Sequence, residues 1–460
     1  MNLLSNVKRV HFIGIGGISM SGLADILLNW GYSVTGSDIQ QSLVINKLKE
    51  KGAQINIPHN SDSVIGADLV VYTSAVKEDN PEIIKAKELG VTVVDRASFL
   101  GYIMKRYEYA IAVAGCHGKT STSSMIALVL DNAKLDPTIL LGGELDAIGG
   151  NAKIGKSPYF VTEACEYMGN FLKFHPSLGI ILNIGEDHLD YFKNINHIKD
   201  TFLKFAKLIP TEGLLILSSE DNHAIEIIPQ VNCNVITFGI DEKADYMARN
   251  IVYNSLGHPS FEIFKNNINM GLYNLIVPGR HNILNALATF AACDSLDIPS
   301  DTIKERLLKF NGTHRRFEIM GESQDITVVD DYAHHPTEIK ATLEAAKQIP
   351  HNRIWCIFQP HTYTRTKLLL KEFAESFCNA DHVIITDIYA AREKDTKLVH
   401  SKDLSKAIDN ISHNAIYIKD FQHIAKYISQ NAKPKDLVMT LGAGSITELG
   451  PMILEELNKI

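Results

Sequence analysis

The clearest structural signal in the sequence is residues 109–131, YAIAVAGCHGKTSTSSMIALVLD. An apolar strand leads into a tight glycine turn, and a helix with periodic apolar positions follows at once. Backbone N–H groups of such a turn face an anion, the Lys119 ammonium adds a point charge, and the Thr120 hydroxyl can hold Mg²⁺. The pattern therefore predicts a phosphate-binding loop, GxxGKT, built from Gly115, Cys116, His117, Gly118, Lys119, Thr120 and Ser121.

A second stretch, residues 150–157 (GNAKIGKS), fits the full Walker A pattern better but lacks its surroundings. No apolar strand precedes it, Pro158 follows directly, and residues 159–162 have the composition of a strand. Without a helix, no helix dipole would point at a phosphate. We therefore reject it as a nucleotide loop.

The composition excludes several classes of protein. The length of 460 residues suggests about three domains, and the net charge of −8 without a Lys/Arg cluster argues against nucleic-acid binding. No apolar run approaches the length of a membrane span, and no signal peptide is recognisable at the start. Six cysteines without a CxxC motif suit a reducing cytoplasm. The sequence does not decide between a monomer and a homodimer.

Strands and helices alternate along most of the chain, which predicts parallel sheets in three consecutive α/β domains. The first domain has expected strands at residues 10–14, 32–36, 67–72 and 91–94, and ends near residue 107. The last domain has expected strands at residues 326–330, 353–358, 382–386, 415–418 and 437–441. The predicted bounds are 1–107, 108–322 and 323–460.

A glycine loop also follows the first expected strand. Residues 14–19 (GIGGIS) open a helix, and Asp38 stands about two dozen residues further on, at the end of the next strand. This is nearly a dinucleotide fingerprint, with Ser19 where the third glycine would be. The loop suits NAD(P) and another nucleotide diphosphate equally well, and Asp38 can accept a hydrogen bond from a ribose hydroxyl.

Acidic and histidine side chains follow two strands of the central domain. Glu163 ends one strand, and His188 follows the next, so both are expected at the carboxyl edge of the sheet beside the phosphate loop. With the Thr120 hydroxyl they form a set that suits Mg²⁺. For four further acidic residues the pattern does not decide between a ligand and a solvated surface group: Glu166, Glu186, Asp187 and Asp190.

Two further clusters precede the last domain. Asn282 and Asn285 lie three residues apart on one helix face, which suits either an adenine edge or helix capping. Arg315 and Arg316 could clamp a transferred phosphate, or form a basic hinge with no ligand.

The last domain carries polar clusters after two strands, DDYAHHP at residues 330–336 and FQPHTYTRT at residues 358–366. With HFIGIGGISMSGLA, AGCHGKTSTSS, GGNAKIGKSPYFVTEACE, NIGEDHLDYF, VPGRHNILNALA and HRRFE, these motifs make the whole chain resemble the Mur ligase family, the ATP-dependent amide-forming enzymes of bacterial peptidoglycan synthesis.

The resemblance implies a Rossmann-like UDP-sugar domain, a central P-loop ATPase-like domain and a Rossmann-like amino-acid domain. The implied reaction is ATP-dependent ligation of L-alanine to the lactyl carboxylate of UDP-N-acetylmuramate, through an acyl phosphate, with Mg²⁺ as cofactor. Domain closure would exclude water that could hydrolyse that intermediate. The implied partners are these two substrates, with no nucleic acid and no membrane, in the cytoplasm.

The resemblance also assigns roles to individual residues. The implied catalytic residues are Lys119, Glu163, His188, Arg316, Asp331 and His334. The implied metal ligands are Thr120, Glu163 and His188. ATP would be bound by the residues of the phosphate loop and by Asn282, Asn285 and Arg316. The UDP-sugar would be bound by Gly14, Ile15, Gly16, Gly17, Ile18, Ser19, Asp38, Ser74, Asn151 and Ala152. The amino acid would be bound by Tyr332, His334, His361 and Arg365.

The chain departs from the family pattern at Cys116, Cys165 and Thr362, where the family often has threonine, aspartate and arginine. Cys165 leaves the role of the missing carboxylate open or passes it to Glu166. Three alternatives remain: a recycling ligase that adds a murein tripeptide, an NAD-dependent oxidoreductase, and a nucleotide-binding regulator without activity.

Overall fold

Residues 3–189, 191–391, 393–395 and 397–459 are described in the computed structural model, and their strands and helices alternate as predicted. Asp190 lies outside the described residues. Two compact units are present. The first comprises Met1–Ile184, Lys199–Thr237 and Ala288–Thr302, and the second Gly185–Ile198, Phe238–Leu287 and Ile303–Ile460. Among the described helices, none combines the length and the apolar character needed to cross a bilayer.

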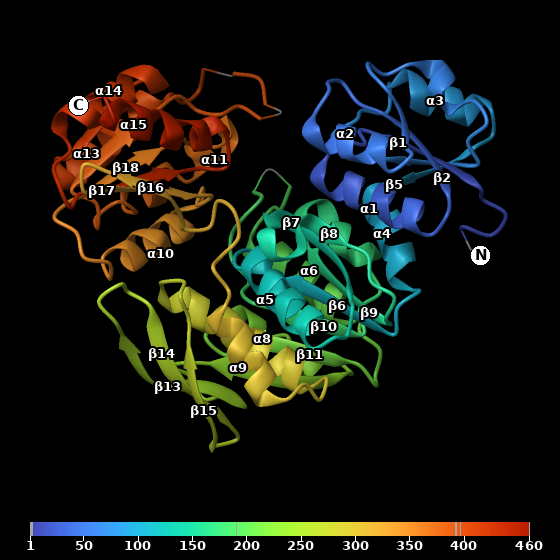
Figure 1. Cartoon of the computed structure of the whole chain (residues 1–460), viewed down its shortest axis with the longest axis horizontal. Coiled ribbons are helices and arrows are strands. Elements are labelled where there is room, and N and C mark those ends of the chain that lie inside the picture. The colour runs from blue at the N-terminus through green and yellow to red at the C-terminus, as the bar shows by residue number, and fades with distance from the viewer. Residues whose placement is uncertain (1–2, 190, 392, 396, 460) are drawn as a thin grey trace. The chain divides into compact units, whose positions relative to one another are not determined.

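The first sheet has five parallel strands in the order β3-β2-β1-β4-β5 (Figure 1). Its strands are β1 (Arg9–Ile13), β2 (Ser33–Ser37), β3 (Gln54–Asn56), β4 (Leu69–Tyr72) and β5 (Thr92–Asp95). Its helices are α1 (Ile18–Asn29), α2 (Leu43–Glu50), α3 (Pro81–Glu88) and α4 (Arg96–Met104). The strand order reverses at β1, so the carboxyl end of β1 is the topological switch point, where α/β sheets bind ligands.

Alternation along β1 builds a core on both faces of this sheet. Phe12 packs edge-on against Phe99 of α4, with ring centroids 5.9 Å apart. Ile13 points to the other face, where it joins a buried cluster with Ile83 and Ala86 of α3. Burial on both faces is what a parallel sheet with right-handed crossovers requires.

The second sheet runs, within the first unit, in the order β11-β10-β6-β9-β7-β8. These strands are β6 (Tyr109–Ala114), β7 (Thr138–Leu145), β8 (Gly150–Lys153), β9 (Tyr159–Ala164), β10 (Leu178–Ile181) and β11 (Leu214–Ser218). The helices of this part of the chain are α5 (Lys119–Asn132), α6 (Ile195–Ala206), α7 (Asn222–Ile225), α8 (Arg280–Asp294) and α9 (Ser300–Leu308). β6 and β9 pair in parallel, which brings the ends of both strands to one edge.

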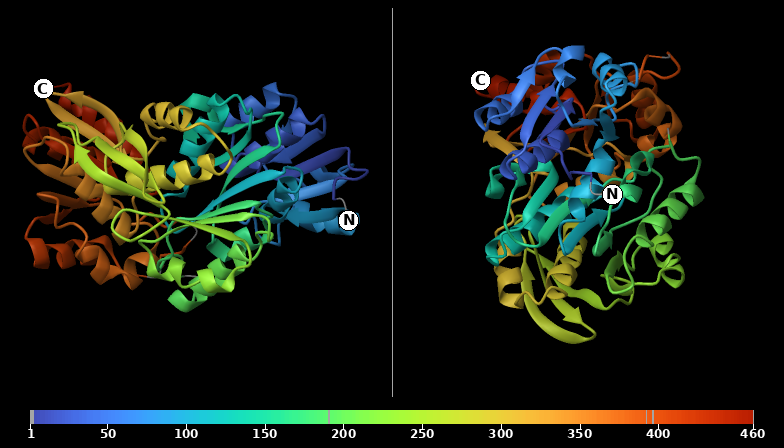
Figure 2. Two further views of the ribbon diagram at one scale, coloured as in Figure 1. Left: turned by 90° about the horizontal axis from the view of Figure 1, so that it is seen from below. Right: turned by 90° about the vertical axis from the view of Figure 1, so that its right-hand side faces the viewer.

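An antiparallel ribbon that the sequence analysis did not predict belongs to the second unit. It consists of β13 (Tyr246–Tyr253), β14 (Pro259–Lys265) and β15 (Ile268–Asn274), yellow-green in Figures 1 and 2. The last residues of β12 (Asn234–Gly239) pair in parallel with the start of β13.

The third sheet also belongs to the second unit and has the order β16-β17-β21-β18-β19-β20. Its strands are β16 (Glu318–Ser323), β17 (Ile326–Asp331), β18 (Ile354–Phe358), β19 (His382–Ile385), β20 (Ala415–Tyr417) and β21 (Leu437–Leu441). Its helices are α10 (Pro336–Ala346), α11 (Tyr363–Leu368), α12 (Leu370–Ala374), α13 (Ser401–Ser412), α14 (Phe421–Asn431) and α15 (Leu449–Leu457). All pairs are parallel except β16 with β17.

Helices cover both faces of the third sheet. Leu437, Met439 and Leu441 pack in a cluster with residues of α10, α12 and α13, whereas Val438 packs with α14 and α15. Alternate side chains of β21 therefore belong to two separate cores, one on each face, as in a doubly wound sheet. Three α/β sheets in series confirm the predicted fold class.

Gly101, inside α4, tests the packing of the first unit. A Cβ at Gly101 would lie 1.9 Å from the backbone oxygen of Lys173, so the two segments would have to separate. Helical Gly→Ala substitutions normally stabilise by up to about 1 kcal/mol. We predict that Gly101→Ala instead lowers the free energy of unfolding by about 2–4 kcal/mol, measured by urea denaturation.

Gly450 of α15 is the matched control, because a Cβ there would meet Met320 at an ordinary 3.4 Å. Gly450→Ala should leave stability unchanged or slightly raised. Equal effects of the two substitutions would contradict the close packing at Gly101.

Candidate functional site: two nucleotide loops and an Arg–His cluster

The phosphate loop has the strand–turn–helix geometry that the sequence predicted. Gly115 and Gly118 adopt φ values of +140° and +85°, which only glycine takes without strain, and Gly118 caps α5. Asn183, which follows β10, holds the turn: its Oδ1 accepts from the His117 N–H at 2.9 Å, and its Nδ2 donates to the His117 carbonyl at 3.0 Å. No role for Asn183 was predicted from the sequence, although its place after a strand beside β6 was an available signal.

Lys119 lies in a buried ion pair. Its Nζ is 3.1 Å from Glu166 Oε2 and donates to the carbonyls of Gly115 and Cys116. Burial alone would lower the pKa of Lys119, but the charge of Glu166 outweighs it and raises the pKa well above its usual range. Lys119 is therefore a fixed cation at the helix N-terminus, and Glu166, which the sequence left undecided, is its partner.

Thr120 and Glu163 supply the oxygen ligands expected for Mg²⁺. The Thr120 hydroxyl donates to Glu163 Oε2 at 3.1 Å, and the Gly142 N–H donates to Glu163 Oε1 at 2.7 Å, which orients the carboxylate. A hydroxyl and a carboxylate side by side fit a hard, oxygen-preferring cation. His188, the third predicted ligand, belongs to the second unit, where its backbone N–H donates to Asp187.

The first glycine loop closes onto Asp38. The Gly16 N–H donates to Asp38 Oδ2 at 2.8 Å, and the Ile39 N–H donates to Oδ1 at 2.8 Å. A side chain at Gly16 would meet that carboxylate at 2.9 Å. Asp38 therefore orders the loop directly, in addition to the ribose contact that the sequence predicts for it.

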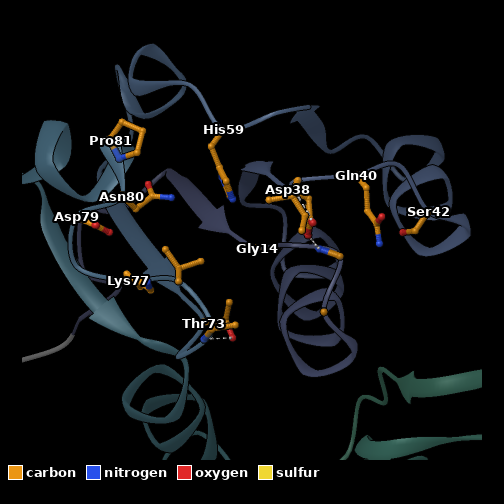
Figure 3. A pocket seen from close by; sticks show the side chains of 15 residues that line it. Gly14, Asp38, Gln40, Ser42, His59, Thr73, Lys77, Asp79, Asn80 and Pro81 are labelled. Atoms are coloured by element: carbon orange, nitrogen blue, oxygen red, sulfur yellow. Dashed lines mark hydrogen bonds between the residues drawn. The ribbon is translucent and has the colours of Figure 1, made fainter. Parts of the chain in front are cut away.

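A cavity of about 710 Å³ opens at this loop (Figure 3). Gly14, Gly16, Gly17 and Asp38 line it, as the sequence predicted for a ligand site. The lining does not include the other predicted residues of this region, Ile15, Ile18, Ser19 and Ser74. It includes residues that the sequence analysis missed, among them Gln40, Ser42, His59, Thr73, Lys77, Asp79 and Asn80. Most of these follow β2, β3 or β4, so their positions after neighbouring parallel strands were a usable signal.

A buried carboxylate contacts residues at the edge of this cavity. Glu82 of α3 is fully buried and accepts from Ser37 Oγ at 2.5 Å and from the Asn60 N–H at 3.0 Å. His59 Nδ1 lies 3.3 Å from the same carboxylate, and the ring points into the cavity between Asn80 and Asp38 (Figure 3). Burial alone would raise the pKa of Glu82, but hydrogen bonds from His11 and Ser37 lower it below its usual value.

The rejected Walker match forms a strand rather than a loop before a helix. Asn151 and Ala152 lie in β8, antiparallel to β7, and β9 follows. Asn151 Nδ2 donates to the Ile18 carbonyl at 2.9 Å, so this predicted sugar contact lies at the start of α1, next to the first glycine loop.

In the second unit, the two arginines of the HRRF motif have different surroundings. Arg315 donates to the carbonyls of Gly442 and Gly444, and its Nε lies 3.4 Å from Asp330. The Arg316 guanidinium stacks over Tyr332 at 5.0 Å, and no ion pair holds it among the described residues. Arg316 is therefore the arginine of this pair that could meet a phosphate, as the sequence predicts.

Asp331 orders the backbone beside these arginines. Its carboxylate accepts from the N–H groups of Phe317 at 2.7 Å and Ala333 at 2.8 Å. Burial raises the pKa of Asp331 to about 6, against the opposing charge of Arg316. Asp331 therefore holds the backbone directly after Arg316 in place.

Asn282 and Asn285 share a face of α8, as predicted. Asn285 Nδ2 donates to Asn282 Oδ1 at 3.0 Å, and Asn282 Nδ2 donates to the Pro278 carbonyl at 2.8 Å. Next to them, burial and then the charge of Arg316 lower the pKa of His281 to about 4, so that its ring is neutral at pH 7. The amide pair remains a predicted adenine contact.

The predicted amino-acid residues gather around one arginine. The rings of His334 and His361 are 5.7 Å apart, and Tyr332 packs edge-on against His334. Arg365 Nη1 lies 3.3 Å from His361 Nδ1, and Arg365 Nη2 donates to Asp187 at 2.7 Å. Burial lowers the pKa of His361 to about 3, together with the charges of His334 and Arg365. Asp187, left undecided by the sequence, is the anionic partner of Arg365.

Three family models match the chain in succession. They are described as "Mur ligase family, catalytic domain" over residues 9–108, "Mur ligase middle domain" over residues 113–293 and "Mur ligase, glutamate ligase domain" over residues 315–444. The chain belongs to the Mur ligase family, and the resemblance seen in the motifs is thereby confirmed.

Individual relatives are similar over their full length. The UDP-N-acetylmuramate–L-alanine ligase of Caldanaerobacter subterraneus subsp. tengcongensis is 55% identical over 456 residues, 99% of each chain. The solved UDP-N-acetylmuramate-alanine ligase of Thermotoga maritima is 32% identical with a TM-score of 0.83, covering 98% of this chain and 99% of its own. A murein peptide ligase structure from Psychrobacter arcticus is 27% identical with a TM-score of 0.71, at the same coverage.

Lys119 and Lys156 form a matched pair of tests, because each is the lysine of a GK[ST] sequence. We predict that Lys119→Ala lowers the turnover of ATP by about a thousandfold or more, since a fixed cation at the transferred phosphate is lost. Lys156, exposed in the rejected match, should be replaceable by alanine without effect. ATP turnover of both variants decides the assignment, and a loss at Lys156 would contradict it.

Glu82 gives a prediction for pH dependence. Its pKa in the folded chain lies below the unfolded value, so its carboxylate stabilises the fold above about pH 4.5, and this contribution is lost as the pH falls through the lowered pKa. Glu82→Gln should therefore lower the free energy of unfolding by about 1–3 kcal/mol at pH 7, and by less at pH 3.5. Urea denaturation across this range measures the difference.

Glu88, exposed on the same helix, is the control. Glu88→Gln should change stability by less than about 0.5 kcal/mol at either pH. A Glu82→Gln effect that does not vary with pH would show that the carboxylate is not the stabilising form.

Proposed function

We propose that this protein is an ATP-dependent carboxylate–amine ligase that joins L-alanine to the lactyl carboxylate of UDP-N-acetylmuramate, giving ADP and phosphate in peptidoglycan precursor synthesis. The observation that carries this proposal is the full-length similarity to relatives named for that reaction, at 55% identity for the Caldanaerobacter protein. The phosphate loop and the cavity at the first glycine loop supply matching chemistry for two nucleotide-type substrates.

The first step transfers the γ-phosphoryl group of ATP to the substrate carboxylate. A carboxylate oxygen attacks the γ-phosphorus, and the bond to the β,γ-bridging oxygen breaks with its electrons leaving on ADP. Phosphoryl transfer needs positioning and neutralisation of charge rather than a protein nucleophile. Lys119 and the N–H groups of the glycine turn hold the phosphates, and Arg316 adds a second cation. Asn282 and Asn285 are the proposed adenine contacts.

Thr120 and Glu163 are the proposed magnesium ligands of the first unit, and His188 that of the second. When bound, Mg²⁺ supplies charge neutralisation at the phosphate oxygens. The Gly142 N–H holds Glu163 in place through its second oxygen.

The second step attaches the amino acid. The amino group of L-alanine must first lose a proton from its ammonium form. Its nitrogen then attacks the acyl carbon, the carbon–oxygen bond to phosphate breaks with release of inorganic phosphate, and the nitrogen loses a second proton to give the amide. Arg365 is the proposed partner of the alanine carboxylate. Because the pKa of His361 is lowered to about 3, its ring is neutral at pH 7. Its Nδ1 accepts from Arg365 Nη1, so the proton lies on Nε2, which can donate a hydrogen bond to the alanine carboxylate. His334 and Tyr332 complete this group of side chains.

We assign the UDP-sugar to a domain at residues 1–107, ATP to residues 108–322 and the amino acid to residues 323–460. The UDP diphosphate would contact Gly14, Gly16 and Gly17. Asp38 would bind the ribose and Asn151 and Ala152 the sugar. We further propose a cytoplasmic enzyme without nucleic-acid or membrane partners, as monomer or homodimer.

The recycling ligase for murein tripeptide is the second candidate, and it has less support. The solved murein peptide ligase of Psychrobacter arcticus has lower identity and TM-score than the Thermotoga alanine ligase at equal coverage.

Phosphate release from Mg-ATP with UDP-N-acetylmuramate tests the proposal. We predict release that depends on both the UDP-sugar and L-alanine, because the carboxylate must be activated before the amine reacts. Release only when free murein tripeptide replaces L-alanine would move the protein to the recycling reaction. No release with either amine would contradict the proposed activity.

A further inference from the structure

Arg96 lies at the edge of the first sheet where the first glycine loop ends. It is the first residue of α4 and follows β5 directly. Its Nη1 donates to Ser19 Oγ at 3.0 Å. Ser19 stands in the first turn of α1, whose N-cap, Gly17, has no side-chain cap. A guanidinium group therefore lies beside an uncapped helix N-terminus, and both favour an anion.

The carboxylate of Asp95, next to Arg96 in the sequence, makes its hydrogen bonds to other groups, although its charge acts on Arg96. Asp95 accepts from the N–H groups of Ala97 and Ser98, from Ser98 Oγ at 2.6 Å, and from Lys173 Nζ at 2.9 Å. Throughout the described ranges, no ion pair to Arg96 is present. Burial lowers the pKa of Arg96, yet a guanidinium stays charged in proteins. A partly buried cation whose hydrogen-bond partner is a neutral hydroxyl is suited to an anionic ligand.

Arg96 and Lys119 both lie close enough to Cys165 for their charges to act on its thiol. Cys165 follows β9, beside the phosphate-loop strand β6. Burial and Glu166 raise the pKa of its thiol to about 11, while the positive charges of Lys119 and Arg96 oppose this rise. The thiol is neutral at pH 7 and neutralises neither cation. Arg96 thus donates to Ser19 beside the first glycine loop and lies in the neighbourhood of Cys165, which follows β9.

An anion site beside the first glycine loop suits the reacting carboxylate of a UDP-sugar. The cavity for the nucleotide is lined by Gly14, Gly16 and Gly17 but by neither Ser19 nor Arg96. A diphosphate at these glycines leaves the sugar and its lactyl group to extend past the loop. Asn151 donates to the Ile18 carbonyl there, so the proposed sugar contacts share this location.

We infer that Arg96 binds the lactyl carboxylate of the UDP-sugar and orients it toward the γ-phosphate. This inference rests on the proposed function. Arg96 gains and loses no proton. It holds one carboxylate oxygen through N–H groups and leaves the other free to form the bond to phosphorus.

Three ligands separate the carboxylate from the diphosphate in a calorimetric titration. UDP carries only the diphosphate, UDP-N-acetylglucosamine adds the sugar, and UDP-N-acetylmuramate adds the carboxylate. We predict that Arg96→Ala weakens binding of UDP-N-acetylmuramate by about ten- to hundredfold and leaves the other two within about twofold. Arg96→Lys keeps the positive charge but loses the planar, two-pronged donor geometry of the guanidinium group. Its affinity for UDP-N-acetylmuramate should fall between those of the wild type and Arg96→Ala.

Arg106→Ala is the matched control, because this exposed arginine stacks on Trp30 away from the loop. It should bind all three ligands like the wild type. Unchanged ADP affinity and melting temperature in Arg96→Lys and Arg96→Ala would show that the fold is intact. Equal weakening for all three ligands, or none for UDP-N-acetylmuramate, would overturn the inference.

The wild-type chain distinguishes this inference from the proposed function. If it releases phosphate with UDP-N-acetylmuramate and L-alanine while Arg96→Ala binds the sugar normally, the inference alone is overturned. If the wild type neither binds UDP-N-acetylmuramate nor releases phosphate with it, the proposed function fails and the inference with it.

Discussion

The backbone turn between β6 and α5 is the constraint on which the site of the first unit depends. Gly115 approaches Leu182 and Asn183 so closely that a Cβ would stand 3.0 Å from the Leu182 side chain, and Gly118 must adopt a left-handed conformation. This turn fixes the position of the start of α5, where Lys119 and Thr120 are the first two residues. Glu166, just after β9, pairs with Lys119, and Glu163, within β9, accepts from Thr120. The charges and oxygens of the site follow from that one backbone path.

Most of the fold could be predicted because buried parallel strands have a strong sequence signal. The expected strands of the first and third sheets agree with the structure to within a few residues, and the phosphate loop follows its strand as predicted. β3 was missed because only Ile55 of its three residues is buried, so no apolar run exists. The ribbon β13–β15 was missed because many of its residues are exposed or half-buried, so it has no run of apolar residues. Its pairing depends on the adjacent strands rather than on local composition.

The residues of the candidate site also differ in how strongly the local sequence signals them. The two glycine turns themselves could be predicted, because the loop geometry restricts the sequence. Pairs of side chains from distant segments could mostly not be predicted. Arg365 and Asp187 are 178 positions apart, and nothing local to either residue signals the ion pair. His59 and Asn80 line the cavity from the segments after β3 and β4, which lie on opposite sides of β1, and that follows only once the strand order is known.

The packing around Gly101 has a consequence for how separable the parts of this chain are. Three family models divide the sequence, but the first of them is not a free module. Lys173 packs on Gly101 and pairs with Asp95, and Leu140 fills the space that a side chain at Gly22 would need. A fragment that stops near residue 107 would lose both contacts and expose the apolar surface beneath them. Exchange of the N-terminal part between relatives would therefore require matching changes on β7, β8 and the segment around Lys173.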